Sequence, residues 1–357
     1  MTCKRKLLYV GEVQSGTTCA MRATALRSLG YDVETVSVVP AVRPPLWKLL
    51  LGKLGNRLRR PIDLNGVNAA ILAKSSSCDV LWIDKGNLVK PATLMQVRSM
   101  HPRPTVVGFS PDDMEQRHCT SVTFHATLPL YDAFITTKSY NVAELGRRGC
   151  QCVIFADNGY DPATHRPVEV AEDLRLARSM SIVFIGYHEL ARQRSIAAVA
   201  GAGFRVDVYG PGWAAVRRRL PETVTVYPAI YGDDYAHTIC SYPIALGFLR
   251  RCNRDLQTTR SVEIPACGCF MLAERTGEHE RLFREGVEAE YFQDDVELVS
   301  KAAYYLAHPD KRAMIAARGR ARCIDGGYAY AQRLEAAMRT IAQRASGGLG
   351  PSPQIHR

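Results

Sequence analysis

The sequence predicts an α/β protein with two parallel-sheet domains. The chain has 357 residues, and one domain usually takes ~100 to 200 residues. Short apolar runs rich in β-branched and aromatic residues alternate with helical patterns, as is typical of parallel α/β units. The alternation stops at a polar, proline-bearing stretch near residues 156–180 and then starts again. We therefore expect two Rossmann-like domains joined at that stretch.

The first half contains six predicted strands separated by helical patterns. One helix is expected from Thr18 to Leu29, closed by Gly30, and another over 141–149, where Gly149 acts as a glycine C-cap. The predicted strands are KLLYVGE, YDVETVSVV, CDVLWID, PTVVGFS, YDAFITT and QCVIFAD.

The second half repeats the pattern, with helices expected over 190–203 and 297–324. Its predicted strands are SIVFIGY, FRVDVYG, TVTVYPA, PIALGFL, CFMLAE and EAEYF. We place the domains at 1–165 and 166–345 and expect a disordered Gly/Pro/Ser-rich tail at 346–357. Open α/β sheets bind ligands at the carboxyl ends of their strands. Two such domains that face each other should form a central cleft with a site on each wall.

The composition favours a globular protein with anionic partners. Hydrophobic residues make up 46% and charged residues 23% of the chain, which are ordinary globular values. No apolar run reaches the ~18 residues that span a bilayer. The net charge of +11 suits phosphates, acidic lipids or nucleic acid. No nucleic-acid partner is expected, because the chain lacks RNP-like aromatic motifs, zinc-finger spacing and a basic heptad region.

The eleven cysteines are interpreted as free thiols in a cytoplasmic protein, because no secretory apolar region occurs in MTCKRKLLYVGEV. The close pairs Cys150/Cys152 and Cys267/Cys269 have C-x-C spacing, whereas zinc knuckles use C-x2-C. We interpret these cysteines as packing residues and expect no metal site and no cofactor.

The loop GEVQSGTT, residues 11–18, follows the first predicted strand and has the glycine spacing of a phosphate-binding P-loop. Thr17 stands where such a loop needs lysine, which argues against ATP hydrolysis. Gly16 and Thr17 remain candidates for binding a phosphate or a polar acceptor group through backbone N–H donors. A plain turn between strand and helix explains the spacing equally well.

Two aspartates follow the strand PTVVGFS. In SPDDM, residues 110–114, Asp112 or Asp113 could act as a catalytic base or hold an acceptor hydroxyl. The alternative is that this segment caps the next helix. His118 is a further candidate base.

In the second half, FIGYHELARQRS places Gly186 after a strand and Arg192 on the following helix. A diphosphate needs both close backbone approach and a forked cation. The alternative for Arg192 is an ordinary surface arginine.

The segment 43–61 carries six cations and no acid, interleaved with Trp47 and leucines. It is typical of an interfacial segment that rests on an anionic membrane or holds a lipid-linked acceptor. An ordinary basic helix packed on its own domain is the alternative.

The stretch RDLQTTRSVEIPACGCF contains two carboxylates eight positions apart, Asp255 and Glu263. Thr258, Thr259 and Arg260 lie between them, where the stretch is expected to enter a helix. Hydroxyls and N–H groups at a helix start can hold phosphate oxygens, and a carboxylate one turn later can accept hydrogen bonds from a diol such as ribose. A charged helix terminus is the structural alternative.

This stretch and its continuation to EAEYF resemble the C-terminal signature of the CgeB-like branch of the group 1 glycosyltransferases, which have the GT-B fold. Asp255-x7-Glu263 is similar to the E-x7-E motif of retaining enzymes of that fold, with aspartate in the first position. The resemblance extends more loosely to FIGYHELARQRS, VDVYGPGW, SPDDM and YDAFITTKSYNVAELGRRGC.

The resemblance implies a GT-B enzyme that transfers a sugar from a nucleotide diphosphate to a hydroxyl, with retention and without a metal. Glu263 would then bind the ribose, and Asp255 would contact the sugar. The diphosphate would be surrounded by Thr258, Thr259, Arg260 and Arg192. The alternative is a non-catalytic nucleotide-sugar or polysaccharide-binding protein of the same fold.

Overall fold

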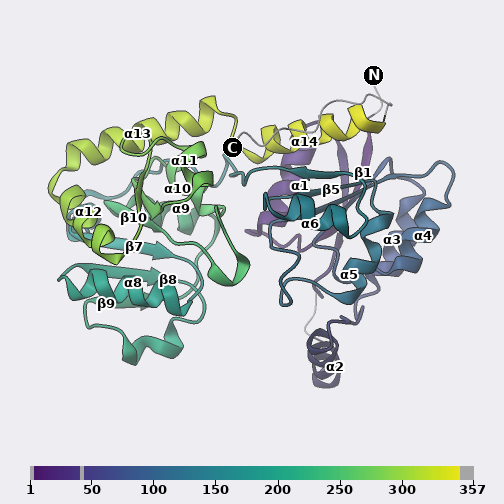
Figure 1. Ribbon diagram of the computed structural model, residues 1–357, viewed down its shortest axis with the longest axis horizontal. Helices are drawn as coiled ribbons and strands as arrows, with labels where there is room; N and C mark the ends of the chain where they lie inside the picture. Colours follow the sequence, from purple (N-terminus) through teal and green to yellow (C-terminus); the bar gives the residue numbers. More distant parts are fainter. Residues whose placement is uncertain (1–3, 41–43, 346–357) are drawn as a thin grey trace. The chain divides into compact units, whose positions relative to one another are not determined.

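The computed structural model describes residues 4–40 and 44–345. The chain forms two compact units. Unit 1 consists of Met1–Asp157 and Tyr330–Arg357, and unit 2 of Asn158–Ala329. Each unit contains one six-stranded sheet with helices (Figure 1). The predicted α/β class is confirmed. The predicted disordered tail, 346–357, lies outside the described residues.

The sheet of unit 1 is parallel, in the order β2-β1-β3-β4-β5-β6. All five residues of β3 are buried, as expected where helices cover both faces of a parallel sheet. The strands are β1 (Lys6–Gly11), β2 (Asp32–Ser37), β3 (Val80–Asp84), β4 (Thr105–Ser110), β5 (Ala133–Thr136) and β6 (Val153–Phe155). The helices are α1 (Thr18–Ser28), α2 (Leu46–Arg57), α3 (Val67–Ser75), α4 (Pro91–Arg98), α5 (Val122–Thr127), the short 3-10 helix η1 (Leu128–Leu130), α6 (Asn141–Arg147) and α14 (Tyr330–Ala345).

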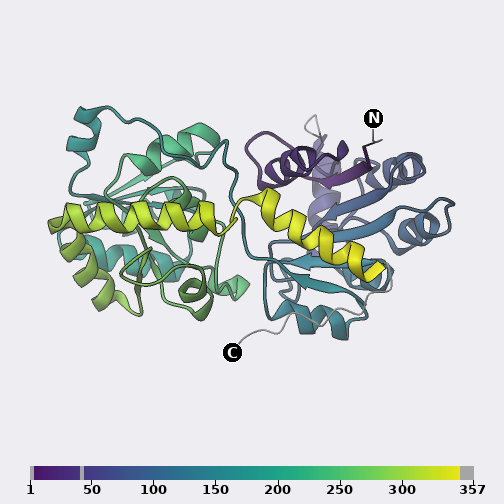
Figure 2. The ribbon, with the colours of Figure 1, turned by 90° about the horizontal axis from the view of Figure 1, so that it is seen from above.

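The last helix, α14, belongs to unit 1 although it follows unit 2 in the chain. Its apolar residues Leu334 and Ile341 share a buried cluster with Leu26 of α1 and Leu7 of β1. Figure 2 shows α14, in yellow, along one face of unit 1. The predicted domains, 1–165 and 166–345, differ from this division because the sequence does not reveal that the apolar face of α14 is buried against α1.

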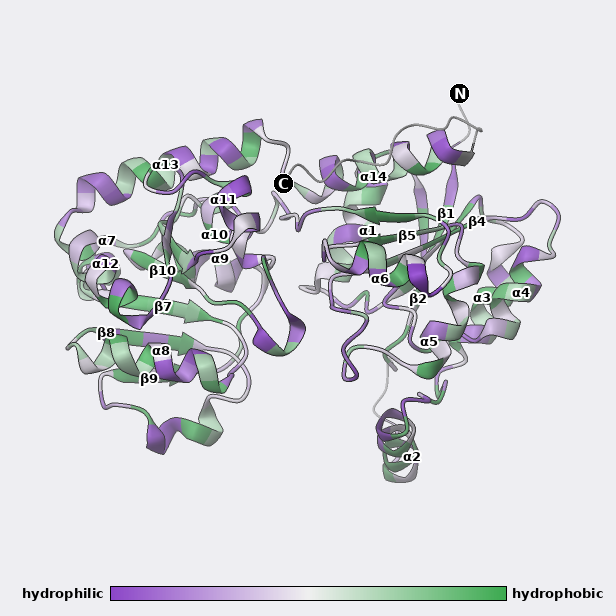
Figure 3. Cartoon of the chain, in the orientation of Figure 1, coloured by the Kyte–Doolittle hydropathy of each residue, from purple (hydrophilic) through white to green (hydrophobic). Residues whose placement is uncertain are grey.

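The sheet of unit 2 is also parallel, in the order β12-β11-β10-β7-β8-β9. Counted along the chain of this unit, this is the 3-2-1-4-5-6 order of a doubly wound Rossmann fold. The strands are β7 (Ser181–Ile185), β8 (Arg205–Tyr209), β9 (Val224–Tyr227), β10 (Ile244–Gly247), β11 (Met271–Glu274) and β12 (Glu290–Phe292). Figure 3 shows β7 and β10 in the green of apolar residues, in line with their complete burial.

The helices of unit 2 are α7 (Glu172–Ala177), α8 (Leu190–Gly201), η2 (Ala214–Arg219), α9 (Gly232–Cys240), η3 (Arg251–Asn253), α10 (Arg260–Ala266), α11 (Gly277–Leu282), α12 (Asp295–Ala307) and α13 (Pro309–Asp325). The helix predicted over 297–324 is broken between α12 and α13 at His308. The break has a local cause, because Pro309 has no N–H and restricts the backbone of the residue before it.

A packing prediction concerns Gly108 of β4. An added Cβ at Gly108 would lie 2.3 Å from Phe134 Cδ2 and 2.9 Å from Tyr131 Cε1, and both rings are buried. We expect Gly108→Ala to lower the free energy of unfolding by about 1–3 kcal/mol, because overpacking forces buried rings out of position. Urea unfolding followed by circular dichroism measures the change.

Gly146 of α6 provides the control. Apart from its chain neighbours and the backbone of its own helix, no described atom lies within 4 Å of an added Cβ there, so Gly146→Ala should stabilise unit 1 by about 0.5–1 kcal/mol through helix propensity. If Gly108→Ala unfolds at the same urea concentration as the parent, the packing around β4 is not as described.

Candidate functional site

The strand order of unit 2 reverses between β7 and β10. Open α/β sheets bind ligands at such a switch point, outside the carboxyl ends of the strands. Here β7 ends at Ile185 and β10 at Gly247. The loops after these strands, with the starts of α8 and α10, contain the residues that the sequence analysis assigned to the donor.

Arg192 of α8 joins the two loops at the switch point. Its guanidinium is buried and donates hydrogen bonds to the carbonyl oxygens of Tyr187 (2.9 Å), Phe248 (3.2 Å) and Leu249 (3.2 Å). Burial, together with the neighbouring positive charge of Arg260, lowers the pKa of Arg192 to about 10, so the side chain stays cationic near neutral pH. Arg192 therefore fixes the loop after β7 to the loop after β10. Its contact with a diphosphate stays a prediction.

Gly186 has no room for a side chain. An added Cβ would lie 2.6 Å from Phe184 Cζ. The carbonyl oxygen of Gly186 accepts a hydrogen bond from Trp213 Nε1 at 2.9 Å, and the backbone of Gly210 packs against the same carbonyl. The end of β7 is therefore tightly packed, and Gly186 is buried there because only glycine fits against the Phe184 ring.

Thr258, Thr259 and Arg260 lie where the chain enters α10, and all three are partly exposed. Arg260 Nε donates to the carbonyl oxygen of Ile185 at 2.7 Å, which ties the start of α10 to the end of β7. Among the described residues, no protein group bonds the two threonine hydroxyls or the backbone N–H groups of Thr259 and Arg260. Unbonded donors at a helix start can hold an anion.

A buried relay fixes this turn from inside. The Thr258 N–H donates to Ser261 Oγ at 3.0 Å, and Ser261 Oγ lies 2.7 Å from His279 Nε2. His279 Nδ1 lies 2.6 Å from the carbonyl oxygen of Glu274, so Nδ1 donates and Nε2 accepts from Ser261. Burial lowers the pKa of His279 to about 4, and the ring is therefore neutral. The relay holds Thr258 in place without adding charge.

Glu263, one turn into α10, is buried beside His165. The distance from His165 Nε2 to Glu263 Oε1 is 3.6 Å, and the side chains are 4% and 7% exposed. His165 Nδ1 accepts a hydrogen bond from the Asp161 N–H at 3.0 Å. The ring proton is therefore on Nε2 and points to the carboxylate. Sequence analysis missed His165, because nothing in its spacing relates it to a residue 98 positions later.

Asp255 closes the loop that follows β10. Its carboxylate accepts hydrogen bonds from Asn253 Nδ2 at 2.7 Å and from the Arg250 N–H at 3.3 Å. Arg254, between them, adopts a left-handed backbone conformation with φ 45°. The two carboxylates of the D-x7-E spacing thus come from different elements, Asp255 from the loop and Glu263 from α10. Contact of Asp255 with a sugar stays a prediction.

In unit 1, the loop 11–18 forms a self-contained turn before α1. Gly16 has a positive φ of 81°, and Thr17 is the N-cap residue. Thr17 Oγ1 lies 2.6 Å from the Glu12 carbonyl oxygen and accepts from the Ala20 N–H at 3.2 Å. The hydroxyl of Thr17 is thus used within the turn, as the structural alternative expects. Phosphate or acceptor binding by Gly16 and Thr17 stays a prediction.

The two aspartates after β4 differ in accessibility. Asp113 is 0% exposed and accepts hydrogen bonds from Asn141 Nδ2 (2.9 Å) and from the Glu115 N–H (3.1 Å). Asp112 is partly exposed and pairs with Lys85 Nζ at 2.8 Å. Asp112 is therefore the more accessible of the two, and Asp113 is bonded within the turn; a catalytic or acceptor-binding role of either aspartate stays a prediction. Lys85, which follows β3, is an addition to the predicted residues.

A buried ion pair lies at the switch point of unit 1, between β1 and β3. Asp84 Oδ2 accepts from Arg22 Nη2 (2.8 Å), Arg22 Nε (3.0 Å) and the Tyr9 hydroxyl (2.6 Å). Both charged side chains are 1% exposed. Removal of one partner would leave a buried charge uncompensated. The cluster thus fixes the backbone that presents Lys85.

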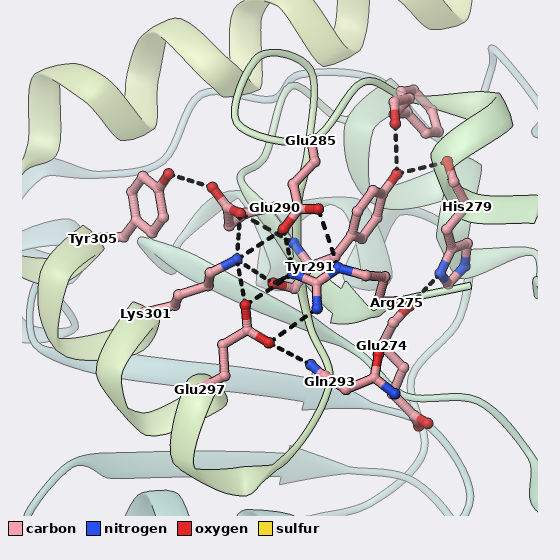
Figure 4. A network of polar contacts seen from close by, with 11 residues as sticks. Glu274, Arg275, His279, Glu285, Glu290, Tyr291, Gln293, Glu297, Lys301 and Tyr305 are labelled. Carbon is pink, nitrogen blue, oxygen red and sulfur yellow. Dashed lines mark hydrogen bonds and ion pairs between the residues drawn. The ribbon is translucent and has the colours of Figure 1, made fainter. Parts of the chain in front are cut away.

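A charged network lies at the end of β11 (Figure 4). Glu274 accepts from the Leu249 N–H at 2.8 Å, which fixes the loop after β10 to β11. The next residue, Arg275, bonds Glu285 at 2.5 Å and Glu297 at 2.8 Å. Lys301 of α12 completes the network with ion pairs to Glu285, Glu290 and Glu297.

Two kinds of feature are absent from residues 4–40 and 44–345. No group of three His, Cys, Asp or Glu residues is arranged to hold a metal ion. No described helix has the length and apolar character needed to cross a membrane.

Residues 192–339 match the model of a family described as glycosyl transferase-like. The match begins at Arg192 and includes Asp255, Thr258 and Glu263. No curated protein matches the chain.

Solved structures resemble the whole chain. Sucrose-phosphate synthase from Thermosynechococcus elongatus has a TM-score of 0.65 at 13% identity, covering 96% of this chain and 100% of that chain. HepE from Anabaena, in complex with UDP and glucose, has a TM-score of 0.65 at 13% identity, covering 95% and 100%. A putative UDP-N-acetylglucosamine 2-epimerase from Listeria monocytogenes has a TM-score of 0.58 at 10% identity, covering 97% and 98%. The predicted GT-B fold is confirmed, and the family match supports the predicted glycosyltransferase.

The charged network around Arg275 predicts how the free energy of unfolding depends on pH in the acid range. Hydrogen bonds from Arg275 lower the pKa of Glu285 and of Glu297 to about 2, whereas an ordinary glutamate titrates near 4.3. A carboxyl with a lowered folded-state pKa stabilises the fold above the unfolded pKa and loses this contribution as the pH falls through the folded pKa. We expect Arg275→Met to be less stable near neutral pH and to lose less stability between about pH 4.3 and 2 than the parent.

Urea unfolding across that pH window measures the difference. Arg339→Met, which removes the exposed pair between Arg339 and Glu335 of α14, is the matched control and should follow the parent. Parallel pH profiles for the parent and Arg275→Met would contradict the assigned pKa shifts.

Proposed function

We propose that the protein transfers a sugar from a nucleoside diphosphate donor to a hydroxyl group, with the donor bound in unit 2. The observation that carries this proposal is the convergence of Gly186, the Thr258–Arg260 turn and Glu263 at the switch point of a sheet in 3-2-1-4-5-6 order. These residues are the right chemical types for a diphosphate and a ribose. Most lie within the part of the chain that matches the glycosyl transferase-like family.

The diphosphate would bind at the start of α10. The unbonded N–H groups of Thr259 and Arg260 and the two threonine hydroxyls offer hydrogen-bond donors without an internal partner to displace. Arg260 adds a cation, and within the described part of the chain one carbonyl, that of Ile185, holds it. The guanidinium of Arg192, already bonded to three carbonyls, would contribute its charge and the rigidity of both loops. Oriented positive groups of this kind stabilise the charge that develops on a leaving diphosphate.

The ribose would be bound by Glu263. A carboxylate can accept hydrogen bonds from both hydroxyls of a diol. His165 Nε2 lies 3.6 Å from one oxygen of Glu263, and the other oxygen is the proposed acceptor for the ribose. UDP is the first nucleotide to test, because the Anabaena neighbour was solved with UDP and glucose.

In the reaction, the bond from the anomeric carbon to the diphosphate breaks and a bond to the acceptor oxygen forms, while the hydroxyl proton leaves. We propose that Asp255 contacts the sugar and that transfer proceeds with retention, without a cofactor or a metal. Similarity of the D-x7-E spacing to retaining enzymes supports retention. Asp112, paired with Lys85, is the proposed acceptor-side residue in unit 1. The CgeB-like branch remains the proposed subfamily.

We also propose that α2 attaches the protein to an anionic membrane on its cytoplasmic face. Gly55 is the only buried residue of α2, and Leu46, Leu50 and Leu54 are each more than half exposed. At 100° per residue, the exposed residues Leu46, Trp47, Leu50, Leu51, Leu54 and Leu58 fall within an arc of roughly 140°. The segment 43–61 has six cations and no acid, so charge and apolar area both favour such a surface.

The donor site predicts a loss of affinity in Glu263→Gln. The variant keeps the shape of the side chain but removes a charged acceptor, and hydrogen bonds to charged groups contribute about 1.5–3 kcal/mol. We therefore expect the Kd for UDP to rise about 10- to 100-fold and the kcat/KM with UDP-sugars to fall in parallel. His165→Phe, which removes the N–H facing Glu263, should weaken UDP binding by a smaller factor. Calorimetry and nucleotide-release assays measure the two quantities.

Glu222→Gln, at an exposed glutamate of unit 2, is the control and should behave as the parent. Unchanged UDP affinity in Glu263→Gln would contradict the proposed binding of the ribose by Glu263. Binding of UDP-sugars without release of UDP, across acceptors, would favour the non-catalytic binding protein.

The membrane proposal predicts binding to anionic vesicles through α2. Burial of one leucine contributes about 1.5–3 kcal/mol, so Leu50→Ser with Leu54→Ser should lower partition onto phosphatidylglycerol-containing vesicles at least roughly 100-fold. Met95→Ser, at an exposed apolar residue of α4, should leave partition unchanged. Partition onto vesicles is measured by sedimentation at low and high salt, with phosphatidylcholine vesicles as a neutral reference. No binding at low salt would contradict the proposal.

A further inference from the structure

Three thiols from separate parts of unit 2 gather at one point. Cys240 is the last residue of α9, and Cys267 and Cys269 lie on either side of Gly268 in the turn after α10. The sulfur atoms of Cys240 and Cys269 are 3.7 Å apart. Cys240 Sγ also lies 3.5 Å from the carbonyl oxygen of Cys267. Cys267 and Cys269, which were interpreted from the sequence as packing residues, therefore lie beside a third cysteine, Cys240, which precedes Cys267 by 27 residues.

The turn that brings them together is specific. Gly268 has a φ of 72°, a conformation that favours glycine. The N–H of Cys267 donates to the Glu263 carbonyl oxygen at 3.1 Å and that of Cys269 to the Ile264 carbonyl oxygen at 3.3 Å, so the end of α10 is closed by this turn. Cys269 is consequently held next to Cys240 by the backbone.

The cluster faces a cavity of about 380 Å³. Arg175 and Arg312 line this cavity together with the three cysteines. Cys240 is partly exposed, whereas Cys267 and Cys269 are buried. A partly exposed thiol in a positively charged environment is the setting in which cysteines react.

Exposure distinguishes the roles of the thiols, because Cys240 is partly exposed whereas Cys269 is buried. Cys269 Sγ lies within hydrogen-bonding distance of Cys240 Sγ, and Cys240 Sγ also donates to the carbonyl oxygen of Cys267. Hydrogen bonds from Cys267 and Cys269 lower the pKa of the Cys240 thiol, and the charge of Arg175 adds to the effect. The thiolate is the nucleophile in oxidation.

We propose that Cys240 and Cys269 form a peroxide-sensitive dithiol, in which Cys240 is the attacking thiolate and Cys269 the resolving thiol. The Cys240 thiolate attacks hydrogen peroxide, the O–O bond breaks, and with one proton the products are a sulfenic acid and water. Cys269 then attacks the sulfenic sulfur, and the disulfide forms with release of a second water. The peroxide supplies both oxidising equivalents.

The required movement is small. A disulfide has an S–S distance of about 2.0 Å, so the two sulfur atoms must approach by roughly 1.7 Å from their present 3.7 Å. The inference is independent of the proposed function.

The test treats the full-length protein with hydrogen peroxide, blocks the remaining thiols with N-ethylmaleimide and maps the peptides by mass spectrometry. The expected product is a Cys240–Cys269 disulfide, reversed by dithiothreitol. In Cys269→Ser, the Cys240 sulfenic acid should persist and be trapped by dimedone. At pH 6, Cys240 should react with iodoacetamide at least about 10-fold faster than a thiol of ordinary pKa near 8.5.

Cys252, which is exposed on η3, serves as the reference thiol. Cys252→Ser should leave disulfide formation unchanged, whereas Cys240→Ser should abolish it. Circular dichroism of each variant establishes that it is folded. The proposal is overturned if a folded parent forms no disulfide, if Cys240 links to Cys267 instead, or if Cys252 is alkylated faster than Cys240.

Discussion

The site in unit 2 depends on one buried cation. Arg192 bonds three main-chain carbonyls, one in the loop after β7 and two in the loop after β10. Parallel strands share no hairpin, so the loops at their carboxyl ends have no direct backbone pairing. A buried guanidinium with several donors in one plane can join them, because each N–H finds an acceptor and the desolvation of the charge is offset by hydrogen bonds.

The other parts of the site attach to this junction. Arg260 ties α10 to Ile185 at the end of β7, and Glu274 ties the loop after β10 to β11. The Ser261–His279 relay and the His165–Glu263 contact fix α10 from its buried side. The exposed side of α10 keeps hydroxyls and N–H groups that no described protein group bonds. The hydrogen bonds within the protein are therefore concentrated on the buried side of α10. The groups that can bind a ligand lie on its exposed side.

Much of the fold could be predicted from the sequence, because parallel strands buried on both faces appear as continuous apolar runs such as VLWID of β3. The residues that contact the side chains of the site could not be predicted. Glu263 and Asp255 were identifiable from their spacing, but His165 and Glu263 meet only through the fold. Asp112 and Asp113 are adjacent in sequence, and only the position of Asn141 assigns one to the interior. The return of α14 to unit 1 depends likewise on a long-range contact, with α1.

The measurement that tests the central claim most directly is amide hydrogen exchange with and without UDP. If the donor binds at the switch point, protection should increase in residues 186–192 and 248–263, which carry the two loops and the start of α10. The loop 11–18, which the sequence predicts as another candidate phosphate site, should exchange at the same rate with and without UDP. Protection of 11–18 with no change in 248–263 would contradict the account.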